Sequence, residues 1–212
     1  MRNYIQAYSI GEAWLLSLQT IIANGVEIGY RDDAILELVP LSIEITHPTL
    51  QDKIIDAYGD TMYLQFLSKN FSDLSPIMNW GYSYAQRLYS YKNSNQVEQV
   101  INKLNLNLSS KSATISLLNS EEDYTHTPCL TTLDFKIRNE TLIINALFRS
   151  QDIGKKMYGD ALEILKIGNY IIEKVPAKKI ILFHTICSAH IYLDDLNGVG
   201  SILRKVEKDL GR

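Results

Sequence analysis

The sequence predicts an α+β fold in which several helices pack on one face of a mixed or antiparallel sheet. Stretches with helical spacing of apolar residues alternate along the chain with short β-rich runs. Two of these runs, 129–138 and 141–149, are separated only by Asn139 and Glu140, which indicates an antiparallel hairpin. Helices bury their apolar stripes against one sheet face, which leaves the other face available for association.

The first third of the chain predicts a helix, a β segment and a second helix. Residues 10–24 have helical spacing, and Gly25 is placed to end that helix. Residues 34–45 have a strand-like alternation that Pro40 interrupts. Residues 50–69 are predicted to form one long helix.

The rest of the chain continues this mixture. A short amphipathic helix is predicted over 95–104, and a strand over 111–118. After the hairpin come a long helix over 155–174 and a buried strand over 179–187. The last segment, 193–210, is expected to be helical with a break near its two glycines.

Composition places the chain among single globular domains and excludes several function classes. It has 212 residues, 46% of them hydrophobic, and we predict one domain over residues 1–212. A net charge of −3 argues against a nucleic-acid coat or a polybasic membrane binder. The chain shows neither a signal-peptide pattern nor the run of about 20 apolar residues that spans a bilayer. Two cysteines, Cys129 and Cys187, are too few for a disulfide scaffold or a thiolate metal site, so we expect a reducing cytoplasm and no metal.

Cys129 is the first residue for which a chemical role competes with a packing role. A lone cysteine is usually a buried core thiol, and Cys187 is assigned that role. A reactive cysteine needs a cationic neighbour that stabilises its thiolate. Arg149 ends the second strand of the hairpin, beside the start of the first, so it can lie next to Cys129.

Three motifs in order resemble the thymidylate synthase superfamily, whose Pro-Cys nucleophile precedes an Arg-Ser-x-Asp motif by about twenty residues. The motifs are His126-Thr-Pro-Cys129, Phe148-Arg149-Ser150-Gln-Asp152 and Ser188-Ala189-His190-Ile191-Tyr192. Upstream, Tyr82-Ser-Tyr84-Ala-Gln-Arg87 is similar to the tyrosine-containing segment of that family. The resemblance covers residues 80–195. It implies a thymidylate synthase-like fold and a homodimer paired through the back of the sheet.

The resemblance also implies a chemistry and its residues. The thiolate of Cys129 would attack C6 of a pyrimidine nucleotide, so that C5 takes a one-carbon unit from 5,10-methylenetetrahydrofolate. Arg149 would stabilise that thiolate and bind the nucleotide phosphate. The remaining nucleotide contacts would be Arg31, Tyr84, Lys111, Ser150, His190 and Tyr192, and the folate contacts Trp80 and Asp152.

Asp160 decides which base the resemblance implies. Eleven residues after the motif arginine, thymidylate synthases carry an Asn that binds uracil, whereas this chain has Asp160. An ionised carboxylate only accepts hydrogen bonds, so it suits the 4-amino group of cytosine and opposes the O4 of uracil. Asp at this place is the mark of cytidylate hydroxymethylases. We therefore expect C5 hydroxymethylation of CMP or dCMP, with water in the last step.

Other positions depart from the family pattern. The catalytic Glu of the family falls on Met62 here, and Gly154-Lys155-Lys156 replaces the usual residues before Asp160. The paired arginines donated across the dimer are reduced to Lys111. The chain also lacks the family's hydrophobic C-terminus, and a looser lid would admit water.

Two alternatives remain beside the hydroxymethylase. One is a compact thymidylate synthase that acts on dUMP, and the other is an inactive relative that still binds a nucleotide. A glutaminase-like or protease-like thiol ranks lower, because no companion His with a supporting carboxylate is specified.

Overall fold

Two mixed β-sheets form the framework of the protein in a computed structural model, which describes residues 3–30, 33–77 and 81–210. The larger sheet has six strands in the order β1-β4-β9-β7-β6-β5. Its strands are β1 (Tyr4–Ala7), β4 (Leu41–Ile45), β5 (Thr114–Ser116), β6 (Leu130–Arg138), β7 (Thr141–Phe148) and β9 (Lys179–Ile186). The smaller sheet has the order β2-β3-β10-β8, with β2 (Val26–Tyr30), β3 (Asp33–Leu38), β8 (Gln151–Asp152) and β10 (Ala189–Tyr192).

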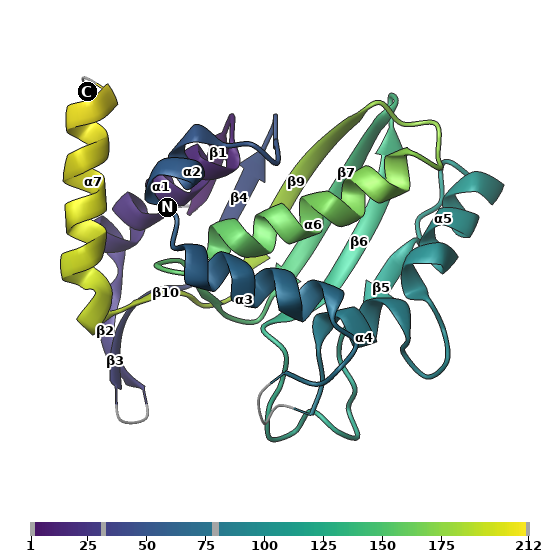
Figure 1. The fold of residues 1–212 in the computed structure, drawn as a ribbon, viewed down its shortest axis with the longest axis horizontal. Coiled ribbons are helices and arrows are strands. Elements are labelled where there is room, and N and C mark those ends of the chain that lie inside the picture. The colour runs from purple at the N-terminus through teal and green to yellow at the C-terminus, as the bar shows by residue number, and fades with distance from the viewer. Residues whose placement is uncertain (1–2, 31–32, 78–80, 211–212) are drawn as a thin grey trace.

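Helices cover one face of the larger sheet, as the sequence predicts (Figure 1). Helix α6 lies across β7 and β9, and α3 runs beside α6. The helices are α1 (Ile10–Asn24), α2 (Lys53–Tyr58), α3 (Thr61–Ser72), α4 (Tyr84–Tyr89), α5 (Gln96–Leu106), α6 (Met157–Ile172) and α7 (Leu196–Leu210), with a short 3₁₀ turn at Leu193–Asp195. The α+β fold class is thereby confirmed.

The predicted hairpin is present as β6 and β7. Its turn residues, Asn139 and Glu140, have φ angles of 49° and 58°, the left-handed conformation that two-residue hairpin turns require. The two strands pair in one register from Arg138 to Thr132, and the register then shifts by one residue, so that Leu130 faces Phe148 at the far end. That register carries Cys129 to Arg149, whose backbone N–H donates to the Cys129 carbonyl at 2.9 Å.

The smaller sheet brings the third motif to the same place. Strand β10 pairs in parallel with β8, so that His190 lies beside Asp152. On its other side β10 pairs with β3, where His190 faces Glu37. The sequence prediction contained one sheet only, because β8 and β10 are too short to show an alternating pattern.

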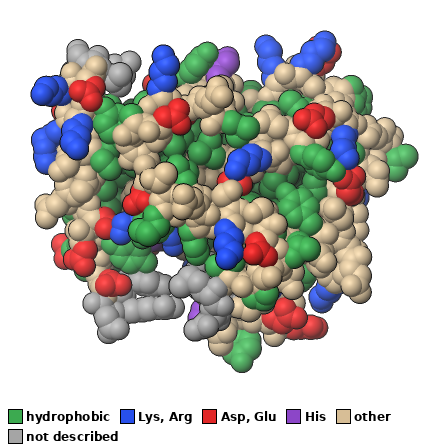
Figure 2. Space-filling view, viewed as in Figure 1, with side chains coloured by type: hydrophobic (Ala, Val, Ile, Leu, Met, Phe, Trp, Pro, Cys, Tyr) green, Lys and Arg blue, Asp and Glu red, His purple; other side chains and the backbone are tan. Residues whose placement is uncertain are grey.

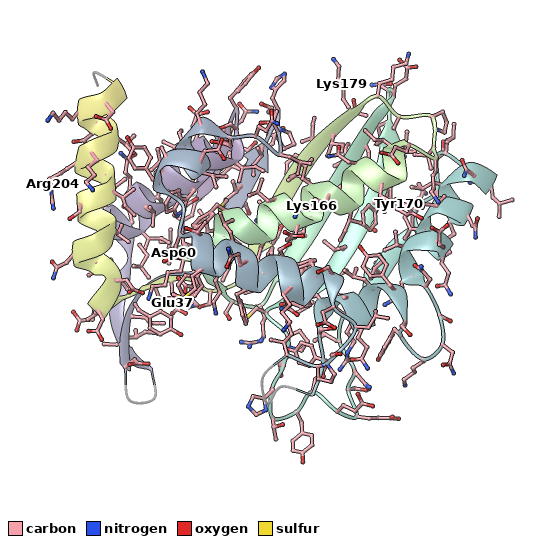
Figure 3. All side chains as sticks on the ribbon, in the orientation of Figure 1. Glu37, Asp60, Lys166, Tyr170, Lys179 and Arg204 are labelled. Atoms are coloured by element: carbon pink, nitrogen blue, oxygen red, sulfur yellow. The ribbon has the colours of Figure 1, made fainter. Side chains whose placement is uncertain are left out.

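The prediction of one continuous helix over 50–69 is wrong, because this segment forms two helices, α2 and α3. Asp52 and Asp60 each accept hydrogen bonds from the first turn of the helix that follows them. Figure 3 shows Asp60 at the start of α3. Between the helices the Gly59 N–H closes α2 on the Ile55 carbonyl. The two aspartates are separate N-cap signals, which explains the break.

Two other predictions need correction. Helix α7 runs unbroken through Gly198 and Gly200, because Val199 and Val206 are buried and their packing outweighs about 1 kcal/mol per glycine. Arg204 projects from the outer side of this helix (Figure 3).

Cys187 is exposed rather than a core thiol. It follows the buried Ile186 at the end of β9, and side chains alternate between the two faces along a strand.

The surface carries charges of both signs on the face in Figure 2. Among the described helices, none is both long enough and apolar enough to cross a bilayer.

Candidate active site

Two neighbouring cavities meet beside the first residue of the hairpin. Their volumes are about 380 Å³ and about 280 Å³. Both are lined by Cys129, Arg149, Lys156 and Asp160. The larger cavity continues toward aromatic side chains, and the smaller one toward the β8–β10 pair. A polar ligand in one cavity and a flat ring in the other would therefore meet at Cys129.

Arg149 is held against the thiol by backbone oxygens. Its Nη2 atom lies 3.8 Å from Cys129 Sγ and donates to the Thr127 carbonyl at 2.7 Å. Its Nε atom lies 3.1 Å from the Pro128 carbonyl. Cys129 and Arg149 are both exposed, so the cation can stabilise a thiolate that remains open to a ligand.

Ser150 extends the same cluster. Its hydroxyl accepts from Arg149 Nη1 at 3.2 Å and lies 3.7 Å from Cys129 Sγ. A guanidinium with a hydroxyl beside it can bind two oxygens of a phosphate. The structure thus brings Cys129, Arg149 and Ser150 together as the sequence predicts.

His190 and Tyr192 line the smaller cavity, together with Asp152. The His190 and Tyr192 rings make an edge-to-face contact with centroids 5.4 Å apart. Burial lowers the pKa of His190, while the nearby Asp152 carboxylate acts against that change. Burial likewise raises the pKa of Asp152, opposed by His190. A neutral imidazole at physiological pH can donate to or accept from a sugar hydroxyl.

Asp160 lies in the first turn of α6 and reaches both cavities. Only 6% of its surface is exposed, and Gln151 Nε2 donates to its Oδ2 atom at 3.1 Å. Burial raises the pKa of Asp160 to about 7, with the Gln151 hydrogen bond and Lys156 acting in the opposite direction. Because Gln151 occupies Oδ2, the other oxygen is the one left for a ligand.

Tyr84 connects the aromatic side of the site to the nucleophile strand. Its hydroxyl accepts from the Leu130 N–H at 2.9 Å, and its own N–H donates to Asn70 Oδ1 at 2.9 Å. Burial raises the pKa of Tyr84 well above its ordinary value, so the ring stays neutral. Tyr84 and Asn70 line the larger cavity with Tyr82 and Phe66.

Some predicted residues do not join this cluster. Arg31 and Trp80 lie outside the described residues. Lys111 is exposed in the loop before β5. Two residues later the Ala113 carbonyl accepts from the Phe135 N–H of β6, and Phe135 lies roughly 20 Å along that strand from Cys129. Lys111 therefore does not reach the cavity of its own chain. Met62, at the family's glutamate position, is 70% exposed at the start of α3.

Sequence reasoning missed three residues of the site. Lys156 lines both cavities. Its position in Gly154-Lys155-Lys156, the stretch that departs from the family pattern, is the sequence signal that could have indicated it. Gln151 occupies the variable position of the Arg-Ser-x-Asp motif, and Glu37 enters from β3. Nothing in the sequence pairs Glu37 with His190, because their contact depends on the register of two short strands.

Comparison with known proteins agrees with this geometry. A family model for thymidylate synthase matches residues 46–212. A protein of Methanosarcina mazei is 29% identical over 206 residues, 95% of each chain. A protein of Methanocaldococcus jannaschii is 31% identical over 72% of this chain and 73% of its own. A protein of Methanothermobacter marburgensis is also 31% identical, over 91% of this chain and 94% of its own. All three are named provisionally as thymidylate synthases.

The matched region carries the residues that the two cavities share, together with the three motifs that surround them. Only the part of the smaller cavity formed by β2 and β3 lies before it. This chain belongs to the thymidylate synthase family.

Proposed function

We propose that this protein is a cytidylate 5-hydroxymethylase, which converts CMP or dCMP to the 5-hydroxymethyl nucleotide with 5,10-methylenetetrahydrofolate and water. Membership of the family makes the protein a one-carbon transferase for a pyrimidine nucleotide. The observation that carries the finer proposal is a buried carboxylate, Asp160, in the cavity that contains Cys129. The dependence on a free thiol also favours a reducing cytoplasm.

The smaller cavity fits the nucleotide. Arg149 and Ser150 would bind the phosphate, and His190 with Tyr192 would bind the ribose 3′-hydroxyl. Asp160 would then face the 4-position of the base. Its Oδ2 atom accepts from Gln151, so the Oδ1 atom is the carboxylate oxygen that would face the exocyclic group. A 4-amino group can donate to that acceptor, whereas O4 of uracil would oppose it.

The larger cavity fits the folate. Phe66, Tyr82 and Tyr84 supply aromatic walls of the kind on which a flat heterocycle packs. Asp152 lines the smaller cavity instead. A folate that packs on these aromatic walls would therefore have to extend its pterin ring past Cys129 to bind Asp152. The bound folate would supply the one-carbon unit at the oxidation level of formaldehyde.

The chain's own residues would handle the covalent steps at the nucleotide. The Cys129 thiolate forms a bond to C6, and the electron pair displaced from the C5–C6 double bond makes C5 nucleophilic. C5 then gains the one-carbon unit and loses its proton, and the bond between the new carbon and the folate nitrogen breaks, so that tetrahydrofolate leaves as the product. Water adds to the exocyclic methylene carbon that remains. The C6–S bond then breaks, which restores the double bond and returns the thiolate.

Release of tritium from C5 tests this proposal. We expect tritium release from labelled CMP or dCMP with methylenetetrahydrofolate, together with a 5-hydroxymethyl product in mass spectrometry. Release from dUMP alone would overturn the proposal in favour of thymidylate synthesis, the second candidate, which the names of the archaeal relatives favour. Nucleotide binding without release from any substrate would instead indicate an inactive relative.

The uncovered face of the larger sheet supports a homodimer. Ile143 and Ile181 are paired neighbours on β7 and β9, and Phe183 lies beside them. All three are only partly buried on the face opposite α6, where Leu147 is 39% exposed. Because Lys111 does not reach the cavity of its own chain, a phosphate contact by Lys111 would have to be made to the partner subunit's site.

Charge on this face should therefore dissociate the protein. Phe183→Lys would bury an ammonium at the contact, which costs far more than the apolar area that it replaces. We expect the wild type to have twice the 24.1 kDa of the chain in light scattering, and Phe183→Lys to be monomeric. Leu106→Lys, at an 88% exposed position at the end of α5, is the matched control. A monomeric wild type at micromolar concentration would contradict the interface.

A further inference from the structure

A buried ion pair lies behind the site, between Arg87 of α4 and Asp123. The Arg87 side chain is 2% exposed and that of Asp123 is 7% exposed, and Arg87 Nη2 donates to Asp123 Oδ1 at 2.7 Å. The guanidinium also lies over two rings, 5.2 Å from the Tyr82 centroid and 5.0 Å from that of Tyr91. A charge buried this deeply is tolerated only with such partners, so removal of one member leaves the other buried without a counter-charge.

Asp123 ties this pair to the loop that precedes Cys129. Its Oδ2 atom accepts from the Asn119 N–H at 2.6 Å, which closes the start of the loop. Its backbone carbonyl accepts from the Thr127 hydroxyl at 2.8 Å, which holds the end of the loop. Residues 119–127 are therefore anchored at both ends to one carboxylate residue, and through it to α4.

The end of this loop orients Arg149. The Thr127 carbonyl accepts from Arg149 Nε at 3.2 Å and from Nη2 at 2.7 Å. The Pro128 carbonyl accepts from Nε as well. Arg149 is an exposed side chain, so these carbonyl groups, with Ser150, are what keep its guanidinium near Cys129.

We propose that Arg87 is a positioning residue, which acts through Asp123 and the loop 119–127 to hold Arg149 against Cys129 and the phosphate position. The proposal deepens the proposed function, since it assumes that Cys129 reacts and that Arg149 binds phosphate. It does not depend on which base or which folate is used. Arg87 also packs over the Tyr82 ring, which lines the larger cavity, so we expect it to position that wall as well.

Alkylation of Cys129 is the direct readout, because it needs neither nucleotide base nor folate. In a Cys187→Ser background, iodoacetamide reports on Cys129 alone, as these are the two cysteines of the chain. We expect Arg87→Met to slow alkylation at pH 7.5 by about 10-fold, the effect of losing one charge-assisted contact. The concentration of inorganic phosphate that gives half protection should rise by a similar factor.

Three further variants separate positioning from stability. Arg87→Met with Asp123→Asn removes both charges but keeps an amide oxygen that can accept from the Asn119 N–H, so it avoids an unpaired buried carboxylate and keeps the test possible where the single variant does not fold. Arg87→Lys keeps the ion pair and should recover part of the alkylation rate. Lys136→Met removes an ion pair with Asp134 elsewhere on β6 and should change neither readout.

A purely structural role would give a different pattern. If Arg87→Met and the double variant lower the melting temperature but alkylate and bind phosphate like the wild type, the proposal is overturned. If both readouts change while cytosine nucleotides give no tritium release, the positioning role stands and the proposed substrate is wrong. The two conclusions can thus fail separately.

Discussion

Replacing Cys129 with Ala is expected to remove C5 tritium release altogether, a loss in kcat/KM of about 10⁴-fold or more. Losses of that size follow the removal of a covalent nucleophile, because no other group takes its place. In this site the hydroxyl of Ser150 is the nearest alternative, 3.7 Å from the sulfur, but it is a far weaker nucleophile at neutral pH and already accepts from Arg149. Release should be measured with each labelled nucleotide.

Binding should survive this substitution. Arg149 keeps its bonds to the Thr127 and Pro128 carbonyls without the thiol, so the phosphate position stays formed. Calorimetry should give nucleotide affinities within a few-fold of the wild type. Cys187→Ala is the matched control, since this exposed thiol follows β9 and lines neither cavity; it should retain full activity. Residual release from Cys129→Ala at a tenth of the wild-type rate would exclude the covalent route.

The juxtaposition of Cys129 and Arg149 could be predicted because it follows from a single local device. Two β-rich runs joined by Asn139-Glu140 predict a tight hairpin, which brings Cys129 and Arg149 to the same open end. The exact pairing there could not be predicted, because a register shift between Leu130 and Thr132 puts Cys129 opposite Arg149 rather than opposite Ser150. His190 was placed by its motif alone. Its strand is four residues long, and a pattern of that length carries little information.

Features that depend on side-chain direction could not be predicted. The sequence does not show that Gln151 turns toward Asp160 rather than toward solvent, since that depends on the parallel pairing of β8 with β10. Lys156 enters both cavities because it directly precedes α6, whose first residue is Met157. Burial of Asp160, and with it the raised pKa, likewise arises from tertiary packing.

Replacing Asp160 with Asn is expected to reverse the choice of base. An amide presents one donor and one acceptor, so it can donate to O4 of uracil and accept from N3–H. The wild-type carboxylate can accept from N3–H but has no donor for O4. Removing a buried mismatch worth about 1–3 kcal/mol, and adding a hydrogen bond, should move the cytosine-to-uracil ratio of kcat/KM toward uracil by about 10²-fold. Competition between labelled dCMP and dUMP measures this ratio directly.

The same argument predicts a pH dependence in the wild type. The pKa of Asp160 is raised by burial to about 7, and Lys156, Asp152 and Glu163 are the charged groups that influence it. Above pH 7 the carboxylate is ionised and, on the proposed function, should reject uracil. Below pH 7 its protonated form carries a donor, as Asn does, and the rejection weakens. The preference for cytosine should therefore rise between pH 6 and pH 8, and in Asp160→Asn it should not change with pH.

Asp152→Asn supplies the control for the base ratio at pH 8, because it makes the same chemical change in the same cavity, at a carboxylate that lies beside His190. It is no control for the pH dependence, since the Asp152 charge raises the pKa of Asp160. It should alter the KM for folate and leave the base ratio in place. An unchanged base ratio in Asp160→Asn would show that another residue faces the 4-position. Since Gln151 is bonded to Asp160 and 2% exposed, it would be the next residue to substitute. A reversed ratio would instead show that the Asp160 carboxylate, which is oriented by the Gln151 amide, determines the preference for a cytosine nucleotide.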